Sequence, residues 1–547
     1  MKQTLKAAAI MTLLAMSTLS PQAALAEVER PKLVVGIVVD QMRWDYLYRY
    51  SNRYGEGGFN RLLQEGNSCE NNRLQYVPAI TAIGHASIYT GSVPSIHGIA
   101  GNAFLIGDRF VSSVEDDNVQ SVGTTTDAGK ASPHNMLTTT IGDELKIATN
   151  GRSKVIGIAL KDRASILPAG HSANAAYWFD DAIGKFVTST HSMKELPEWV
   201  NSFNNKKLPD QLMTADWTTL YPMETYTQST ADANEYENPL VKGAKYATMP
   251  LELRKLLKEK GYGIIRSLPA GNTLTAELAK AAIEGEKLGE DGTTDFLAIS
   301  FSSTDYLGHA MGTHAVETED MYLRLDQTLA DFFNFLDSKV GKGNYLLFLT
   351  ADHGAMNNPT YLQDMKIPAL TWGGRSIKEA LNEELGKAYG AKDLVRTIMC
   401  NQIYYNMNVV DSLGLDFDAV KATTVKFLLK DPKIQYACDM EKARTSSIPT
   451  EISERIVNGY NNERSGSVQF ITKASYIENG PKGTGHSMWN PYDTHTPLIF
   501  MGWHIEHGET TRETFTSDIA STICTLLHIQ APNGSIGHAI DEVIKKK

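Results

Sequence analysis

Short apolar segments that run into a polar or acidic residue recur along the chain and constrain its fold more than any other feature. The first ends at Asp40, and a later one is followed by Asp352. The segments are residues 33–39, 155–160, 296–301, 345–349 and 498–501. Uninterrupted apolar stretches of strand length are typical of parallel strands that helices cover on both faces.

Helical patterns alternate with these segments, at residues 137–148, 274–288 and 316–340. The alternation predicts an α/β fold: a doubly wound, mostly parallel sheet with helices on both faces. Two long segments, about 165–272 and about 358–482, interrupt it. Structureless loops of that length are uncommon in compact domains. We therefore predict one α/β domain over residues 27–547 with two sizeable inserted subdomains, which cover the functional site at the carboxyl ends of the strands.

The first 26 residues have the pattern of a secretory signal peptide. Lys2 and Lys6 precede an apolar stretch at 7–16, and small residues precede a predicted cleavage after Ala26. No later apolar segment reaches 18 residues, so no membrane span is predicted. The sequence therefore predicts an exported protein.

The charge balance and the cysteines limit the possible functions. The chain has 63 acidic and 52 basic residues, a formal charge of −11, which disfavours a nucleic-acid partner but not a small anionic ligand. An exported protein with four cysteines can form disulfides. The first disulfide to test is the one between Cys400 and Cys438. The alternative is that these two cysteines, like Cys69 and Cys524, are buried unpaired thiols.

Aspartates and histidines gather where the predicted strands end. Asp305 and His309 are spaced i, i+4, so one helical turn places them on the same face. Taken singly, each residue could be a helix cap or a structural histidine. Together, carboxylates and imidazoles are the ligands that zinc accepts where cysteine is absent. The full set is Asp40, Asp305, His309, Asp352, His353 and His486.

Thr81 is the candidate hydroxyl group. It stands near the start of the predicted helix 79–89, where free backbone N–H groups and the helix dipole favour an anion. The turn-rich segment 90–102 can return Asn102 to the same helix end. Considered alone, Thr81 would be an ordinary helix-start residue, and His97 in the turn-rich segment is interpreted as structural.

The order of these motifs resembles the alkaline phosphatase superfamily, and the whole mature chain is similar to its periplasmic, monomeric, phosphate-irrepressible alkaline phosphatases. The resemblance implies two Zn²⁺ per chain and Thr81 as the nucleophile that forms a phosphothreonine. It assigns one zinc to Asp40, Thr81, Asp352 and His353, and the other to Asp305, His309 and His486. It also implies a monomer in the periplasm that acts on phosphate monoesters of broad range and releases inorganic phosphate.

Lys161 and Arg163 distinguish a monoesterase from a diesterase. They follow the predicted strand 155–160, and their charges suit the unesterified oxygens of a monoester. In the family this Lys-x-Arg pair marks the phosphatases, and Asn102 matches an amide that donates to a phosphoryl oxygen. A solvated turn is the plain alternative for the pair. The alternative functions are a phosphodiesterase or nucleotide pyrophosphatase, or a non-catalytic phosphate- or metal-binding protein.

Overall fold

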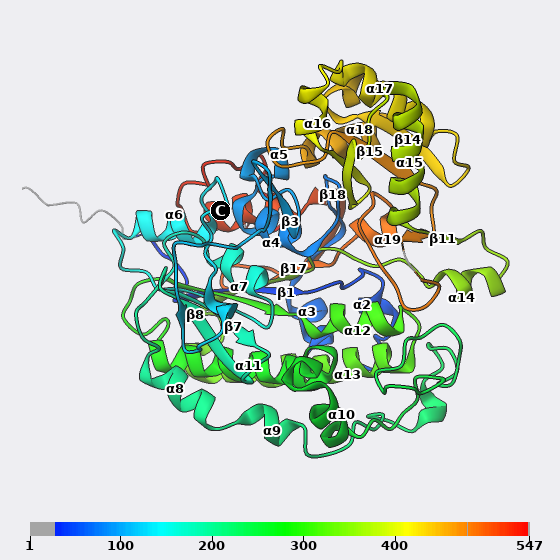
Figure 1. Cartoon of the computed structure of the whole chain (residues 1–547). Helices are drawn as coiled ribbons and strands as arrows, with labels where there is room; N and C mark the ends of the chain where they lie inside the picture. The colour runs from blue at the N-terminus through cyan, green and yellow to red at the C-terminus, as the bar shows by residue number, and fades with distance from the viewer. Residues whose placement is uncertain (1–27, 479, 545–547) are drawn as a thin grey trace, which may run out of the picture. The chain divides into compact units, whose positions relative to one another are not determined.

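The computed structural model describes residues 28–478 and 480–544, so the predicted signal peptide lies outside the described residues. A ten-stranded sheet forms the centre of residues 31–547 (Figure 1). Its strand order is β18 (Gly508–Phe515), β2 (Asn67–Arg73), β17 (Leu498–Gly502), β10 (Tyr345–Thr350), β1 (Leu33–Val39), β9 (Asp295–Phe301), β6 (Val155–Ala159), β7 (Ala175–Asp180), β8 (Lys185–Ser189) and β5 (Ser121–Val122).

The five central strands, from β10 to β7, are parallel, which confirms the predicted α/β class. Towards the edges, β17 pairs antiparallel with β10, and β8 pairs antiparallel with β7. The apolar segment 498–501 was expected among the parallel strands, but it runs the other way as β17. Its residues are almost fully buried, and burial alone produces a continuous apolar stretch whatever the strand direction.

Helices cover both faces of the sheet, as the alternating side chains of β1 show. Leu33, Val35 and Ile37 pack into a core that includes α11 (Pro269–Glu286) and α13 (Val316–Leu336). Val34 and Val38 pack on the other face, in a core that includes α4 (Thr81–Thr90), α6 (Ile141–Ala148) and α20 (Asp518–Leu526). Successive strand residues point to opposite faces, so one continuous apolar segment supplies two cores.

Within the second predicted insertion, a four-stranded antiparallel sheet has its own core. Its order is β12 (Val395–Met399), β13 (Gln402–Tyr405), β15 (Val468–Thr472) and β14 (Ile434–Asp439). Helices α15 (Gly374–Tyr389) and α17 (Phe417–Leu428) share that core. Within the first predicted insertion, β7 and β8 pair as strands of the main sheet, so only part of that range lies outside it.

Helix α18 (Thr450–Gly459) holds the segment that leads into α4. Arg455 accepts a hydrogen bond from Val77 N through its carbonyl oxygen (3.1 Å), and Asn458 Nδ2 donates to the carbonyl oxygen of Gln75 (2.8 Å). A Cβ atom at Gly459 would overlap the carbonyl oxygen of Val77. The backbone of α18 therefore lies directly against the approach to Thr81.

The four cysteines are free thiols, so the alternative without disulfides holds and the Cys400–Cys438 pair is not formed. Among the described residues, no helix combines the length and the apolar character needed to cross a membrane.

Candidate active site

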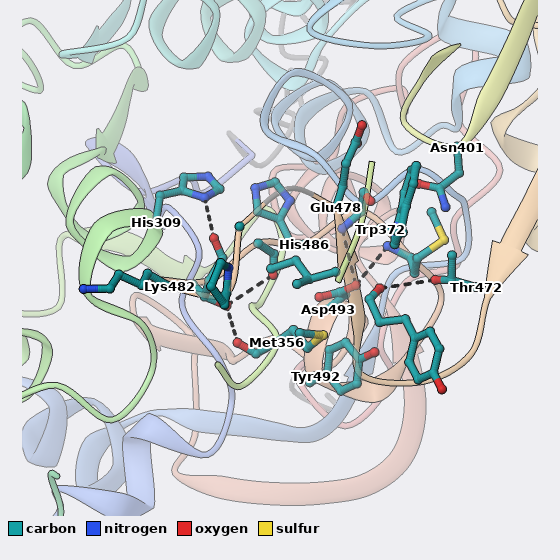
Figure 2. A pocket seen from close by; sticks show the side chains of 18 of the residues that line it. His309, Met356, Trp372, Asn401, Thr472, Glu478, Lys482, His486, Tyr492 and Asp493 are labelled. Atoms are coloured by element: carbon teal, nitrogen blue, oxygen red, sulfur yellow. Dashed lines mark hydrogen bonds between the residues drawn. The ribbon is translucent and has the colours of Figure 1, made fainter. Parts of the chain in front are cut away.

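The candidate site lies beyond the carboxyl ends of the central parallel strands, which bring their following residues together. Asp40 directly follows β1, and Asp352 follows β10, the parallel neighbour of β1. On the other side of β1, β9 leads into α12 (Ser303–Met311), which carries Asp305. A cavity of about 720 Å³ opens beside these residues, and its lining includes His309 and His486 (Figure 2).

Asp40, Asp352 and His353 form the buried group of the site. All three are fully buried. His353 Nε2 lies 3.6 Å from Asp40 Oδ1 and 3.4 Å from Asp352 Oδ2. None of these three atoms has a hydrogen-bond partner among the described residues. Three converging, unpaired donor atoms in a buried place fit a divalent metal ion, since unpaired buried polar groups are otherwise costly.

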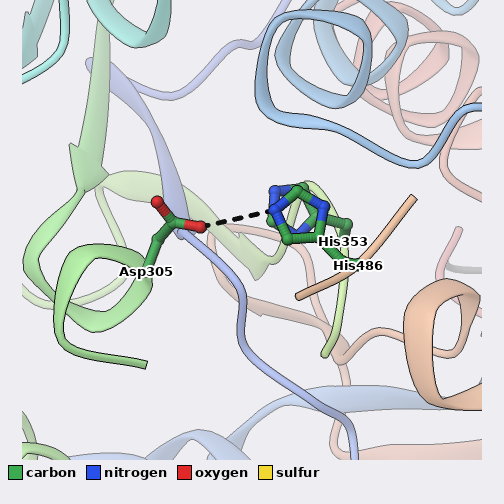
Figure 3. Close-up of side chains that lie close together, drawn as sticks. All are labelled: Asp305, His353 and His486. Atoms are coloured by element: carbon green, nitrogen blue, oxygen red, sulfur yellow. Dashed lines mark ion pairs between the residues drawn. The ribbon is translucent and has the colours of Figure 1, made fainter. Parts of the chain in front are cut away.

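Asp305, His309 and His486 form the open group. His309 Nε2 lies 3.2 Å from Asp305 Oδ1, and His486 Nε2 lies 3.7 Å from the same oxygen. Figure 3 shows Asp305 facing His353 and His486, whose rings stack with centroids 3.6 Å apart. Donor atoms of Asp305, His353 and His486 approach within 4.8 Å of one another, so His353 lies at the boundary of both groups.

The backbone orients all three imidazoles. Each Nδ1 atom lies 2.7–3.0 Å from a backbone carbonyl oxygen: His309 with Thr484, His353 with Gly354, and His486 with Ala79. An Nδ1–H group that donates to a carbonyl leaves the lone pair on Nε2. The three Nε2 atoms are those that face the carboxylates, so the rings present ligand atoms to the site.

Electrostatics keeps two of the three residues of the open group, Asp305 and His486, in the forms that bind metal, whereas Asp305 raises the pKa of His309. Burial alone would raise the pKa of Asp305, but Lys161 and His309 outweigh it and hold that pKa well below its ordinary value. Burial, together with His353 and His309, holds the pKa of His486 well below its ordinary value. A charged carboxylate and a neutral imidazole are the forms that coordinate a cation.

Thr81 is the first residue of α4 and is 2% exposed. The next backbone N–H, that of Ala82, donates to Asn102 Oδ1 (2.9 Å), so the turn-rich segment does return Asn102 to this helix end. A Cβ atom at Gly84 would overlap the backbone of Asp352, and its absence lets α4 lie against the buried group. The sequence thus places a hydroxyl group, a helix N-terminus and an amide at one point.

Lys161 joins the two groups. Its ammonium group donates to Asp40 Oδ2 (2.7 Å) and Asp305 Oδ2 (2.6 Å) and lies 3.3 Å from Thr81 Oγ1. Burial alone would lower the pKa of Lys161, but these two aspartates raise it above its ordinary value, so the group is charged. Arg163 is half-buried, and its Nη1 atom lies 3.5 Å from Asp162. Lys161 is therefore no solvated turn residue.

Two residues of the site were not singled out from the sequence. Gln41 donates from its backbone N to Asp352 Oδ1 (3.1 Å) and from Nε2 to Asp305 Oδ1 (2.8 Å), which links the buried and open groups. His85 Nδ1 lies 3.3 Å from Asp352 Oδ2 and 2.9 Å from the carbonyl oxygen of Thr81. The signals were weak: Gln41 merely follows Asp40, and His85 falls one turn after Thr81.

A family model described as type I phosphodiesterase / nucleotide pyrophosphatase matches residues 34–488. The chain belongs to this family, within the alkaline phosphatase superfamily. The matched range contains all ten candidate residues of the site, from Asp40 to His486.

Relatives within the family cover nearly the whole chain. A protein of Myroides odoratus named calcium-transporting ATPase is 51% identical and covers 95% of this chain and 96% of its own. Alkaline phosphatase PhoV of Synechococcus elongatus is 51% identical, covering 95% of this chain and 94% of its own. The crystal structure of alkaline phosphatase PafA is 49% identical, with a TM-score of 0.93, and covers 95% of this chain and 100% of its own. A PafA variant with a substituted threonine, asparagine, lysine and arginine has a TM-score of 0.92.

Proposed function

We propose that this chain is an exported alkaline phosphatase that hydrolyses phosphate monoesters at a centre of two zinc ions. The observation that carries the proposal is the position of Lys161. Its buried ammonium group lies 3.3 Å from the Thr81 hydroxyl and donates hydrogen bonds to the carboxylates of Asp40 and Asp305. A monoester carries one more unesterified oxygen than a diester does. A positive charge at this place stabilises the negative charge on that oxygen. Relatives at about 50% identity that are named alkaline phosphatases support it.

The donor atoms divide between two ions. Asp40, Asp352 and His353, with Thr81, hold one zinc in this proposal, and Asp305, His309 and His486 hold the other. Oxygen and imidazole ligands without cysteine suit zinc, and the unpaired atoms of Asp40, Asp352 and His353 support the fit. When bound, the ions supply Lewis-acid stabilisation of negative charge on the reacting oxygens.

Thr81 acts as the nucleophile. Its Oγ forms a bond to phosphorus while the ester P–O bond breaks and the alcohol leaves, which gives a phosphothreonine. Water then displaces Thr81 and releases inorganic phosphate. Lys161 and Arg163 stabilise charge on the non-bridging oxygens, and the Asn102 amide donates to one of them. The PafA variant supports these roles, because it replaces the same four residue types in the same chain order.

The proposal also covers substrate range, location and assembly. We include a broad range of small monoester substrates and a monomeric state. We also include a periplasmic location after cleavage of the signal peptide behind Ala26. The name of the Myroides relative adds ATP as a compound to test. The terminal phosphoryl group of ATP carries unesterified oxygens like those of a monoester, so the same residues suit it.

The decisive experiment compares p-nitrophenyl phosphate with methyl p-nitrophenyl phosphate, using protein of known zinc content. We expect the monoester to be preferred by orders of magnitude and two zinc ions per chain. Thr81→Ala removes the activity, and the Lys161→Ala/Arg163→Ala variant loses the monoester preference. A preference for the diester, or an unchanged monoester rate in the double variant, would assign the chain to the diesterases. Zinc-loaded protein that never forms phosphothreonine would indicate a binding protein.

A further inference from the structure

A cavity of about 720 Å³ adjoins the open group and leads away from it. His309 and His486 line one part of the cavity, and Trp372, Asn401 and Thr472 line another (Figure 2). Its walls come from α12, from the loop that carries His486, and from both predicted insertions. A volume of this size exceeds what a phosphoryl group needs and falls in the range of pockets for small organic molecules.

The deeper wall presents flat and polarisable side chains. Trp372 is 5% exposed, and its ring packs edge-on against Phe470 with centroids 5.3 Å apart, so its orientation is fixed. Tyr476 and Tyr492 line the same cavity, together with the thioether groups of Met356 and Met488. Aromatic rings and thioethers favour contact with another planar ring over contact with a flexible aliphatic chain.

The acidic residues of the lining are already engaged with the backbone. Asp493 Oδ2 accepts hydrogen bonds from the N–H groups of Ser487 (3.3 Å) and Met488 (2.9 Å). Glu478 Oε1 lies beside Gly374 at the start of α15. A Cβ atom at position 374 would overlap this oxygen, so glycine is needed there. These carboxylates hold the wall in place, so the lining does not favour a cationic ligand over a neutral ring.

The direction of the reaction leads into this cavity. In phosphoryl transfer the attacking and leaving oxygens lie roughly in line with phosphorus. In the proposed function Thr81 shares a metal ion with the buried group and attacks from that side, so the leaving oxygen emerges on the side of the open group. There His309 and His486 form part of the cavity wall.

We propose that this cavity is a subsite for the leaving alcohol and that it binds a planar aromatic ring, such as a nucleobase or a phenyl group, carried by that alcohol. The proposal rests on the proposed function, because it names the part of the monoester that distinguishes one substrate from another. It assigns Trp372 and Tyr476 as residues that determine specificity without taking part in the chemical step.

Matched pairs of substrates test it. Adenosine 5′-monophosphate and ribose 5-phosphate present the same type of leaving oxygen and differ in the base, and 3-phenylpropyl phosphate and propyl phosphate differ in the phenyl ring. We expect kcat/KM about tenfold higher for a ring-bearing member, chiefly through KM, which corresponds to about 1.4 kcal/mol. An advantage in either pair supports the subsite, and the pair that shows it identifies the ring. Equal kcat/KM within both pairs would overturn the proposal.

Variants locate the effect. Tyr476→Ala and Trp372→Ala should bring the ratio of kcat/KM within the pair towards one. Tyr389→Ala, which changes an aromatic residue of the same insertion that does not line the cavity, should leave the ratio unchanged. An unchanged ratio in Tyr476→Ala would contradict the assignment even if Trp372→Ala failed to fold.

A binding measurement separates this proposal from the proposed function. Calorimetry with adenosine or 3-phenylpropanol alone, whichever matches the favoured pair, should detect binding that Tyr476→Ala weakens about tenfold. Absence of that binding would count against the subsite. If no monoester were hydrolysed, the proposed function would fail, whereas hydrolysis with equal kcat/KM within both pairs would refute the subsite alone.

Discussion

The buried and the open groups of the site use similar side chains in different surroundings. Asp40, Asp352 and His353 follow central strands of the sheet and are fully buried. In the open group, α12 carries Asp305 and His309, and the side chain of His309 is 44% exposed. Strand ends therefore position the buried group, while a helix and a loop carry the open group, where the leaving alcohol departs in the proposed reaction. The proposed function needs the most precise alignment at Thr81, next to the group that strand ends hold.

The largest effect is expected from the buried group. Asp352→Ala removes a carboxylate that accepts a hydrogen bond from Gln41 N and faces His353 Nε2, so it should lower monoester kcat/KM by more than about 10³-fold and remove bound zinc. Metal analysis and steady-state kinetics measure both, with Asp411→Ala on an exposed helix as the control. Restoration of activity by added zinc would show that the buried group is not the rigid one.

His309→Ala tests the open group and should cost less, about 10- to 100-fold in kcat/KM. Because the side chain is half-exposed, excess zinc should restore part of the activity, as water can take the vacated position. A zinc titration of the variant measures this. A loss equal to that of Asp352→Ala, without rescue, would remove the distinction between the two groups.

Gln41→Ala tests the link between them. The backbone N–H to Asp352 stays, and only the side-chain hydrogen bond to Asp305 is lost, so we expect about tenfold lower kcat/KM. Zinc should be lost first from the open group, which a competition with a chelator can follow. Equal release from both groups would mean that Gln41 also supports the buried one.

The smallest effect concerns stability near the open group. Glu237 is buried, and its neighbour Tyr236 accepts a hydrogen bond from Gly483 N (2.7 Å) in the segment that leads to His486. Burial and then the charge of Glu317 raise the pKa of Glu237 from 4.5 to about 9. Asp232 contributes to this rise in pKa, whereas Asn234 and Lys482 oppose it. Between these values the folded state keeps a proton that the unfolded state loses, so stability falls as pH rises.

Glu237→Gln removes this titration. The fall in melting temperature from pH 5 to pH 9 should therefore be smaller in the variant, by about 2 °C. Thermal unfolding at the two pH values measures it, and monoester kcat/KM should change little. An identical pH dependence in both proteins would show that Glu237 keeps its charge in the folded state.

The sequence predicted what depends on a local pattern. An apolar segment followed by a carboxylate was enough to place Asp40 and Asp352 at strand ends, and the i, i+4 spacing was enough for Asp305 and His309. It could not show the direction of β17, because burial and not direction shapes its apolar pattern. The roles of Gln41 and His85 depend on contacts between distant segments, which no local spacing reveals. The division of the site residues between two zinc ions stays a prediction.

The contact between α18 and the segment before Thr81 has a consequence for how such enzymes diversify. Because the backbone at Gly459 lies against the carbonyl oxygen of Val77, the second insertion is not an independent attachment to the core. A chimera that exchanges this insertion between relatives must keep glycine at position 459, or the segment that leads into Thr81 will be displaced. Substitutions in the part of the insertion that lines the cavity leave this contact intact, whereas substitutions at position 459 disturb the core.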